Sequence, residues 1–309
     1  MNGDPAKLAA QLADITDGHV QTDKPLAPYT SYKIGGRTAL WAAPTTEAGV
    51  GRVLRFIHEK QLPLFVLGYG SNVLVSDTGW QGITLCLREN LSGWRFDYEQ
   101  AQVLAGTRLL DFIRATVSNG LGGMEPLAGI PGSVGGALRM NAGAFGREIE
   151  AMTLAVSGFL RDGSSFQAER RQIDFGYRQA SRLEKTVITS SRFHLETEDA
   201  GVLQARMQEI LTLRGKKQPL DHPSCGSVFK RPPGYYAGSL IEQADLKGQR
   251  IGGAVVSHKH AGFILNTQNA TAADVYALIR LIENRVYERF GVRLEREVKL
   301  IGNFDEHTT

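Results

Sequence analysis

The sequence is poor in the features by which several classes of protein are recognised. Its 309 residues include only two cysteines, Cys86 and Cys225, which lie far apart with no CxxC, so neither a disulfide framework nor a zinc site is indicated. No apolar run approaches the roughly 18 residues that a membrane span needs, and the opening MNGDPAKLAAQLADITDG lacks the apolar core of a signal peptide. The net charge of +3 is too small to indicate a nucleic acid or an anionic membrane as partner. We therefore expect a soluble, cytoplasmic protein that binds no metal, nucleic acid or membrane.

The remaining composition is that of a globular protein with one exception, its glycine content. Hydrophobic residues make up 42% and charged residues 22%, which excludes disordered, collagen-like and coiled-coil chains. Of the 35 glycines, nine lie between positions 120 and 146. Such a cluster indicates backbone that passes close to something, or many positions of positive φ. We expect a bulky ligand against bare backbone, with a set of plain loops as the alternative.

The apolar patterns predict alternating helices and strands in three lobes, at residues 1–88, 89–200 and 201–309. We expect helices at 46–60, at 107–120 with Thr107 as N-cap, at 201–216, and at 271–290 between Thr271 and Gly291. Strands are expected for LPLFVLG, NVLVSDTG, GITLCLR, WRFDYEQAQVLAG, TLAVSGFL, KTVITSSRFHL and the alternating tail VRLEREVKLIG.

The segment LGYGSN, residues 67–72, is the first candidate binding loop. It lacks the third glycine and the following helix of a dinucleotide fingerprint, since NVLVSD reads as another strand. Successive backbone N–H groups in such a strand–loop–strand can form a nest for phosphate. A simple hairpin turn fits the loop equally well.

A second candidate is GIPGSVGGALRMNAGAFG, residues 129–146. Pro131-Gly132-Ser133 sets a turn, Gly135-Gly136 removes side chains, and the stretch from Asn141 to Gly143 allows close approach again. A planar ring with polar edges, such as a flavin, would suit this backbone. Together the two loops predict a cradle for an extended cofactor that contains phosphate.

Seven segments in order resemble one enzyme family. They are TSYKIGG, VLGYGSNVLVSD, GIPGSVGGALRMNAGAFG, DFGYRQA, PSCGSVFK, LIEQADLKGQRIGGAVVSHKHAGFILN and LEREVKLIG. The chain is similar over residues 22–303 to the UDP-N-acetylenolpyruvoylglucosamine reductases, also called UDP-N-acetylmuramate dehydrogenases, in their shorter form.

This resemblance implies an α+β protein with the FAD-binding fold of the p-cresol methylhydroxylase and vanillyl-alcohol oxidase class, two α/β lobes and a third lobe for substrate. It implies non-covalent FAD, NADPH as the hydride donor, and reduction of UDP-N-acetylglucosamine enolpyruvate to UDP-N-acetylmuramate for peptidoglycan synthesis. The cofactor-binding residues are then expected to be Gly68, Tyr69, Gly70, Ser71, Asn72, Val73, Pro131, Gly132, Ser133, Gly135, Gly136, Asn141 and Gly143.

Three catalytic residues follow from the same resemblance. Hydride addition to the enolpyruvyl double bond leaves negative charge beside a carboxylate, so the reaction needs a cation and a proton donor. Arg178 matches the cation of a Tyr-Arg motif and Ser227 the proton donor. Glu297 matches the second glutamate of LEREV, where a neighbouring carboxylate would favour its protonated form. Periodicity alone does not distinguish Glu297 from Glu295.

Substrate contacts are expected from Tyr177, Lys217, Gly226 and Lys230, with Lys217 suited to a diphosphate. Arg231 departs from the asparagine common at this position in the family, so that role is not carried over. His258 and His260 form a His-x-His pair with no further residues at ligand spacing.

Two other functions stay open. A flavin-dependent sugar or alcohol oxidase on the same fold would need a catalytic base and often a covalent histidine. A binding protein for nucleotide sugars would have lost the flavin.

Overall fold

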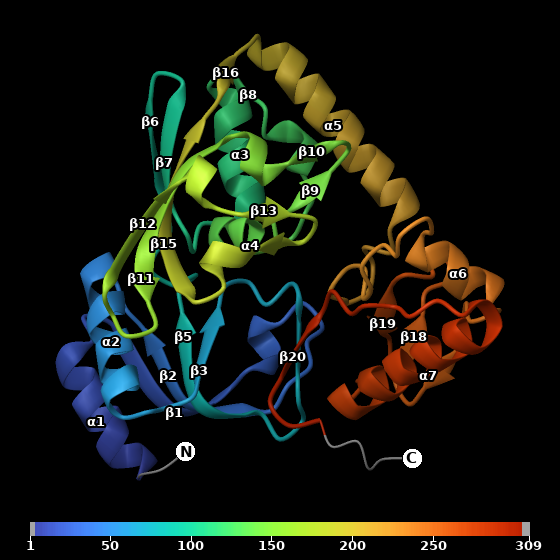
Figure 1. Cartoon of the computed structure of the whole chain (residues 1–309), viewed down its shortest axis with the longest axis horizontal. Helices are drawn as coiled ribbons and strands as arrows, with labels where there is room; N and C mark the ends of the chain where they lie inside the picture. The colour runs from blue at the N-terminus through green and yellow to red at the C-terminus, as the bar shows by residue number, and fades with distance from the viewer. Residues whose placement is uncertain (1–3, 305–309) are drawn as a thin grey trace. The chain divides into compact units, whose positions relative to one another are not determined.

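A computed structural model of the chain describes residues 4–304, which form two compact units (Figure 1). Unit 1 contains the chain up to Asp23, Ala39–Tyr69 and Gly82–Arg214, and unit 2 contains Lys24–Thr38, Gly70–Gln81 and the chain from Gly215 onward. The expected three lobes stay a prediction. None of the helices in the described part of the chain combines the length and the apolar character that a membrane crossing requires.

The first sheet of unit 1 has the strand order β1-β2-β5-β3. Its strands are β1 (His19–Pro25), β2 (Arg37–Ala43), β5 (Trp80–Cys86) and β3 (Leu64–Leu67), and β3 runs parallel to β5. Helices α1 (Pro5–Ile15) and α2 (Glu47–Glu59) lie beside it (Figure 1). The predicted helix at 46–60 is confirmed as α2, because Thr46 accepts the Gly49 N–H and apolar residues such as Val53 and Ile57 face the core.

The second sheet of unit 1 is antiparallel, in the order β12-β11-β15-β7-β6. Its strands are β12 (Ser165–Glu169), β11 (Thr153–Leu160), β15 (Thr186–His194), β7 (Gln100–Leu104) and β6 (Trp94–Asp97). Helix α3 (Leu109–Ser118) packs against it through Phe112, whose ring centroid lies 5.8 Å from that of Phe193. The strands predicted for TLAVSGFL and KTVITSSRFHL are confirmed as β11 and β15.

The expected N-cap of α3 is wrong. Thr107 bonds instead to the backbone of Gly93, and Arg108 occupies the cap position without a side-chain hydrogen bond. The helix ends where expected, since Gly120 follows it with φ +67°.

Two further α-helices and three short strand pairs belong to unit 1. The helices are α4 (Val134–Arg139) and α5 (Ala200–Lys217). The last residues of α5 belong to unit 2, and its buried residues are Leu203, Met207 and Ile210, so the helix predicted at 201–216 is confirmed. The strand pairs are β8 (Leu121–Gly122) with β16 (Glu196–Thr197), β9 (Gly143–Ala144) with β10 (Arg147–Glu148), and β13 (Phe175–Gly176) with β14 (Gln179–Ala180).

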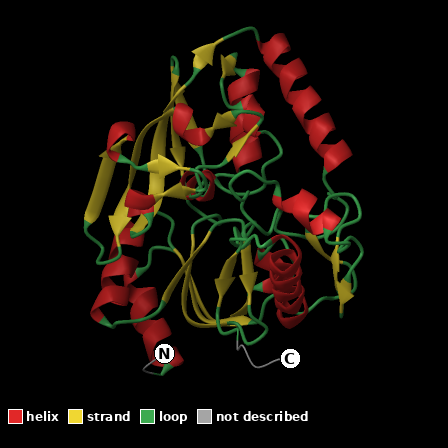
Figure 2. Ribbon diagram, turned by 45° about the vertical axis from the view of Figure 1, so that its right-hand side comes forward, coloured by secondary structure: helices red, strands yellow, loops and turns green. Residues whose placement is uncertain are grey.

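Unit 2 has a separate core beneath its longest helix, α7 (Ala272–Phe290). Its other elements are α6 (Ala237–Gln243), the sheet of β17 (Arg250–Ile251), β18 (Ala254–Val256) and β19 (Ile264–Asn266), and the parallel pair β4 (Val73–Val75) and β20 (Lys299–Ile301). The predicted helix is confirmed, since Thr271 caps α7 and Gly291 ends it at φ +68°. Helices and strands occur in both units, so the expected α+β class is confirmed (Figure 2).

The tail is only partly a strand. Of the alternating segment 292–302, only Lys299–Ile301 pairs with another strand. The residues before it follow an irregular path because the N–H groups of Glu297 and Val298 both donate to the carbonyl of Val228.

Candidate active site

The loop from β3 to β4 carries an unusual run of unpartnered backbone donors. Within residues 4–304, the N–H groups from Gly68 to Asn72 have no hydrogen-bond partner. Gly70 has φ +61°, and a Cβ there would lie 2.3 Å from the Tyr29 carbonyl oxygen, so only glycine fits. β3 pairs with β5 and β4 with β20, which excludes a simple hairpin. Five successive free donors are what a phosphate nest requires.

The two glycine-rich motifs meet in unit 1. A Cβ on Gly68 would lie 2.4 Å from Ser133 Oγ, so the first motif touches the second directly. Ser133 is the N-cap of α4 and its hydroxyl accepts the Gly136 N–H at 3.2 Å. The Gly135 N–H donates to Ala105, which fixes the backbone of the second motif against β7.

The glycine cluster at 120–146 does not need a ligand to explain it. Five of its glycines have positive φ, namely Gly120, Gly123, Gly129, Gly132 and Gly146. The other four would bring a Cβ within 3.3 Å of another part of the chain; they are Gly122, Gly135, Gly136 and Gly143. The conformation and packing of the chain thus account for these glycines without a ligand, and the expected ligand against this backbone stays a prediction.

Tyr177 and Arg178 form the turn between β13 and β14 in unit 1. Arg178 has φ +56°, an uncommon backbone conformation for a residue with a side chain. Its guanidinium donates to the Gly143 carbonyl at 3.3 Å and lies 5.0 Å from the centre of the Tyr177 ring. The second glycine-rich motif thus holds the predicted catalytic arginine.

Ser227 and Glu297 are brought together in unit 2. The Glu297 N–H donates at 2.8 Å to the carbonyl of Val228, the residue next to Ser227. The Glu297 carbonyl in turn accepts the side-chain amide of Asn72 at 3.1 Å. Hydrogen bonds therefore join the backbone of Glu297 to the backbone beside Ser227 and to the side chain of Asn72, at the end of the phosphate-binding loop. Arg178 belongs to unit 1, so its meeting with this pair stays a prediction.

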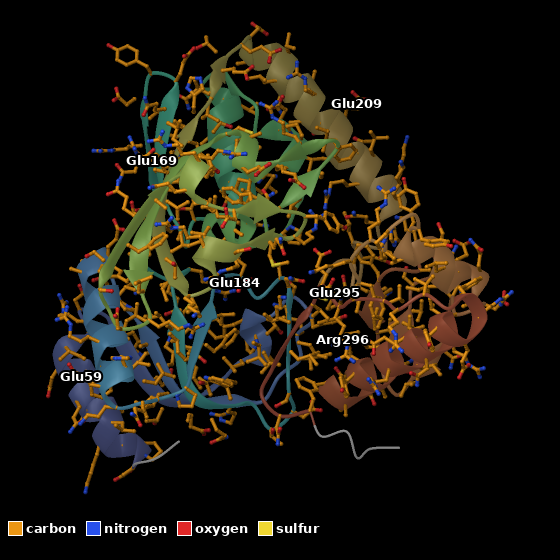
Figure 3. All side chains as sticks on the ribbon, viewed as in Figure 1. Glu59, Glu169, Glu184, Glu209, Glu295 and Arg296 are labelled. Carbon is orange, nitrogen blue, oxygen red and sulfur yellow. The ribbon has the colours of Figure 1, made fainter. Side chains whose placement is uncertain are left out.

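The structure distinguishes the two glutamates that periodicity left equivalent. Glu297 is half-buried, whereas Glu295 forms an ion pair with Lys230. Glu295 itself is exposed, and Figure 3 labels its side chain. Lys230 is itself largely buried, with 16% of its side chain exposed.

Two other expected substrate residues have free space around them. Gly226 has φ +81° and no atom within 4 Å of a Cβ position. Lys217 is exposed at the end of α5. Arg231 lies 4.0 Å from the centre of the Tyr236 ring, a contact that the sequence did not suggest.

A buried thiol lies two residues before Ser227. Burial raises the pKa of Cys225 to about 12, and the Tyr32 hydroxyl, with which this thiol interacts, is also fully buried.

Within the part of the chain that the structure describes, the histidine pair shows no sign of metal binding. His260 is half-buried, and its Nδ1 accepts the Gly262 N–H at 3.1 Å; burial lowers the pKa of this imidazole. No group of three metal-ligating side chains occurs among residues 4–304.

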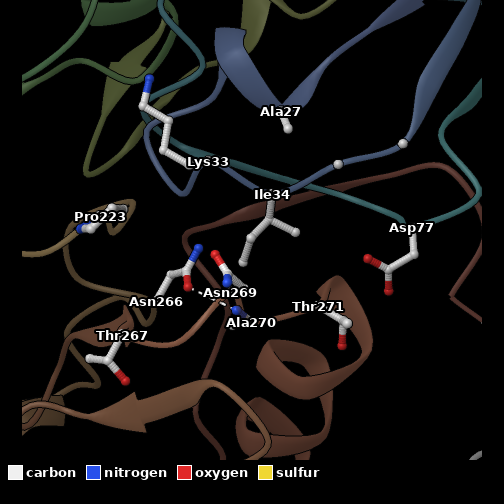
Figure 4. A pocket seen from close by; sticks show the side chains of 12 residues that line it. Ala27, Lys33, Ile34, Asp77, Pro223, Asn266, Thr267, Asn269, Ala270 and Thr271 are labelled. Atoms are coloured by element: carbon white, nitrogen blue, oxygen red, sulfur yellow. Dashed lines mark hydrogen bonds between the residues drawn. The ribbon is translucent and has the colours of Figure 1, made fainter.

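A cavity of about 470 Å³ in unit 2 contains none of the predicted site residues (Figure 4). It is lined by Lys33, Asp77, Asn266 and Asn269 beside the start of α7. The Asp77 carboxylate accepts the N–H groups of Ala272 and Ala273, so these helix donors are already satisfied.

Comparison with known proteins agrees with this geometry. The family model described as FAD binding domain matches residues 38–168. This segment includes the free N–H loop and the Gly68–Ser133 contact. The fold and the site therefore define an FAD-binding oxidoreductase.

A second family model, the C-terminal domain of UDP-N-acetylenolpyruvoylglucosamine reductase, matches residues 218–301. The reductase of Listeria innocua serovar 6a is 41% identical over 96% of this chain and 98% of its own. Reductase 2 of Bacillus cereus is 40% identical over 94% of this chain and 96% of its own. The crystal structure of the Thermus caldophilus enzyme has a TM-score of 0.78 at 33% identity and covers 92% of this chain and 98% of its own. The chain belongs to the UDP-N-acetylenolpyruvoylglucosamine reductase family.

Proposed function

We propose that the chain reduces the enolpyruvyl group of UDP-N-acetylglucosamine enolpyruvate to give UDP-N-acetylmuramate, with NADPH as co-substrate, in the cytoplasm. Family membership supports the UDP-sugar substrate, as relatives at about 40% identity carry this name over nearly the whole chain. The observation that supports the proposal most directly is the position of Glu297, whose N–H donates to the carbonyl of Val228, next to Ser227, and whose carbonyl accepts the side-chain amide of Asn72.

The residues present fit FAD. The free N–H groups from Gly68 to Asn72 would hold its diphosphate, because consecutive backbone donors bind anions without a charged side chain. Val73 continues this loop into β4, and Pro131 to Gly136 would lie against the ring system. When bound, FAD supplies the hydride that it has taken from NADPH. The LGYGSN loop contains no histidine, and the proposal is that the flavin is bound without a covalent link.

The side chains of the chain supply charge and a proton. The planar guanidinium of Arg178 would grip the substrate carboxylate with two hydrogen bonds and stabilise the negative charge that develops beside it. Ser227 Oγ–H would donate its proton to the carbon that carries this charge. The half-buried Glu297 carboxyl would donate a hydrogen bond to the same carboxylate when protonated.

The substrate's nucleotide would be held by other residues of unit 2. Lys217 would pair with the diphosphate, and Lys230 would contact the sugar nucleotide beside the open backbone of Gly226. Tyr177, which is 47% exposed, offers a ring surface next to Arg178.

Rapid-mixing spectroscopy of the two half-reactions tests this proposal. Ser227→Ala should leave bleaching of the flavin by NADPH intact and block its reoxidation by the enolpyruvyl sugar nucleotide. Equal damage to both halves would give Ser227 a structural role. Fast reoxidation of the wild-type protein by air alone would indicate an oxidase instead, and a colourless purified protein would indicate a nucleotide-sugar binding protein.

A further inference from the structure

A fully buried asparagine lies behind the turn that carries Arg178. Asn141 has no exposed surface, and all its polar side-chain atoms are used within unit 1. Its amide nitrogen donates to Glu148 Oε2 at 2.8 Å and to the Gly176 carbonyl at 3.2 Å, and its oxygen accepts the Glu150 N–H at 3.3 Å. Gly176 is the last residue of β13, immediately before Tyr177 and Arg178.

The same segment holds the turn at a second point. The guanidinium of Arg178 donates to the Gly143 carbonyl, and Gly143 pairs with Glu148 across the β9–β10 hairpin. A Cβ on Gly143 would lie 2.7 Å from Glu148 Cγ. Glycine at this position therefore leaves room for the Glu148 side chain to reach Asn141.

We propose that Asn141 and Glu148 are positioning residues for Arg178. Glu148 fixes the amide of Asn141, which ties down the backbone entering the turn, while Gly143 anchors the guanidinium. This support is needed because Arg178 has φ +56°, a conformation that surrounding contacts have to maintain. The proposal rests on the proposed function of Arg178 and gives Asn141 and Gly143 a role through that side chain.

The most informative variant is Glu148→Ala. Glu148 is only half-buried, so its replacement should destabilise the fold less than a change at the fully buried Asn141. We expect the rate of flavin reoxidation by the enolpyruvyl substrate to fall about 10- to 100-fold, as misplacement by an ångström or less costs rates of this order. Flavin reduction by NADPH should stay within twofold of wild type. Glu148→Gln retains an acceptor oxygen for Asn141 and should restore most of the activity. Asn119→Ala, an exposed asparagine of the same unit, is the matched control and should leave both rates unchanged.

A double-mutant cycle shows whether the effect passes through Arg178. In an Arg178→Ala background, Glu148→Ala should change the reoxidation rate by no more than twofold. A full additive loss in that background would overturn the proposal, as would wild-type activity of Glu148→Ala itself. An Arg178→Ala variant that keeps the wild-type reoxidation rate would refute the role proposed for Arg178 and the positioning role together, while leaving the proposed reductase activity in place.

Limited proteolysis provides a readout that does not depend on activity. Trypsin should cut after Arg178 several-fold faster in Glu148→Ala than in wild type or in Asn119→Ala, because the turn has lost its support. Unchanged cleavage would show that the network does not hold the turn, even if Arg178 proves catalytic.

Discussion

The contact between the two glycine-rich motifs leads to a prediction with a defined magnitude. In Gly68→Ala the new Cβ would stand 2.4 Å from Ser133 Oγ, about 1 Å closer than ordinary contact. The Ser133 side chain would have to rotate away and release the Gly136 N–H that it caps. Loss of such a cap costs about 1 kcal/mol, and overpacking adds to it, so we expect a destabilisation of about 1–3 kcal/mol.

A double-mutant cycle measures this contact. Ser133→Ala alone should cost about 1 kcal/mol through loss of the cap. The pair Gly68→Ala/Ser133→Ala should cost little more than Ser133→Ala, because without Oγ the nearest atom to the new methyl group is Ser133 Cβ at 3.3 Å. Denaturant unfolding of the FAD-free protein gives these free energies. Gly215→Ala is the control, since no atom lies within 4 Å of its Cβ position.

The interpretation depends on the coupling energy. If the two substitutions add within about 0.5 kcal/mol, residues 68 and 133 do not share the contact described here. A Gly68→Ala protein as stable as wild type would refute the steric reasoning directly.

Five other outcomes are expected. Glu297→Gln should retain more substrate-dependent flavin reoxidation than Glu297→Ala, because an amide can still donate the hydrogen bond expected of the protonated carboxyl; equal rates would contradict that role. Thiol titration at pH 8 should find Cys225 and Cys86 unreactive until the protein is unfolded, because burial raises their pKa to about 12 and about 11 and leaves almost no thiolate. Both folded pKa values exceed the unfolded value near 9. The contribution of these thiols to the free energy of unfolding should therefore be fully present below pH 9 and be lost as the pH rises toward 12, and Cys225→Ala should reduce that loss. Asp77→Ala should lower the stability of unit 2 by about 1–2 kcal/mol in a thermal melt, because two donors of α7 lose their acceptor. Acid precipitation should release all the flavin into the supernatant, and colour kept on the protein would show a covalent bond.

The sequence predicted correctly those helices whose ends are set by residues adjacent to them in the chain. α7 was predictable because its cap Thr271, its apolar stripe and its terminal Gly291 are all local. The error at Thr107 has the opposite cause. A threonine hydroxyl bonds to whichever backbone group is nearest, and here that group is Gly93, on another part of the chain.

In the candidate site, too, the sequence located residues by local motifs but missed contacts made with distant parts of the chain. The sequence motifs located Ser227 and the pair Glu295 and Glu297, but the alternation of the tail could not choose between the glutamates. The structure separates the two side chains through a distant part of the chain, since Glu295 pairs with Lys230 and Glu297 is half-buried, while the catalytic role of Glu297 stays a prediction. Glu148 carried no signal, since it becomes relevant only when Asn141 folds back against it.

The pairing of β4 with β20 has a consequence for the order in which the chain folds. Asn72, at the start of this pair, bonds to Glu297, 225 positions later. At about 5–20 residues per second, the ribosome needs roughly 10–45 s to make the intervening segment. During that time β4 lacks the strand with which it pairs in the folded protein, so this part of unit 2 can form only after residues 299–301 have been made.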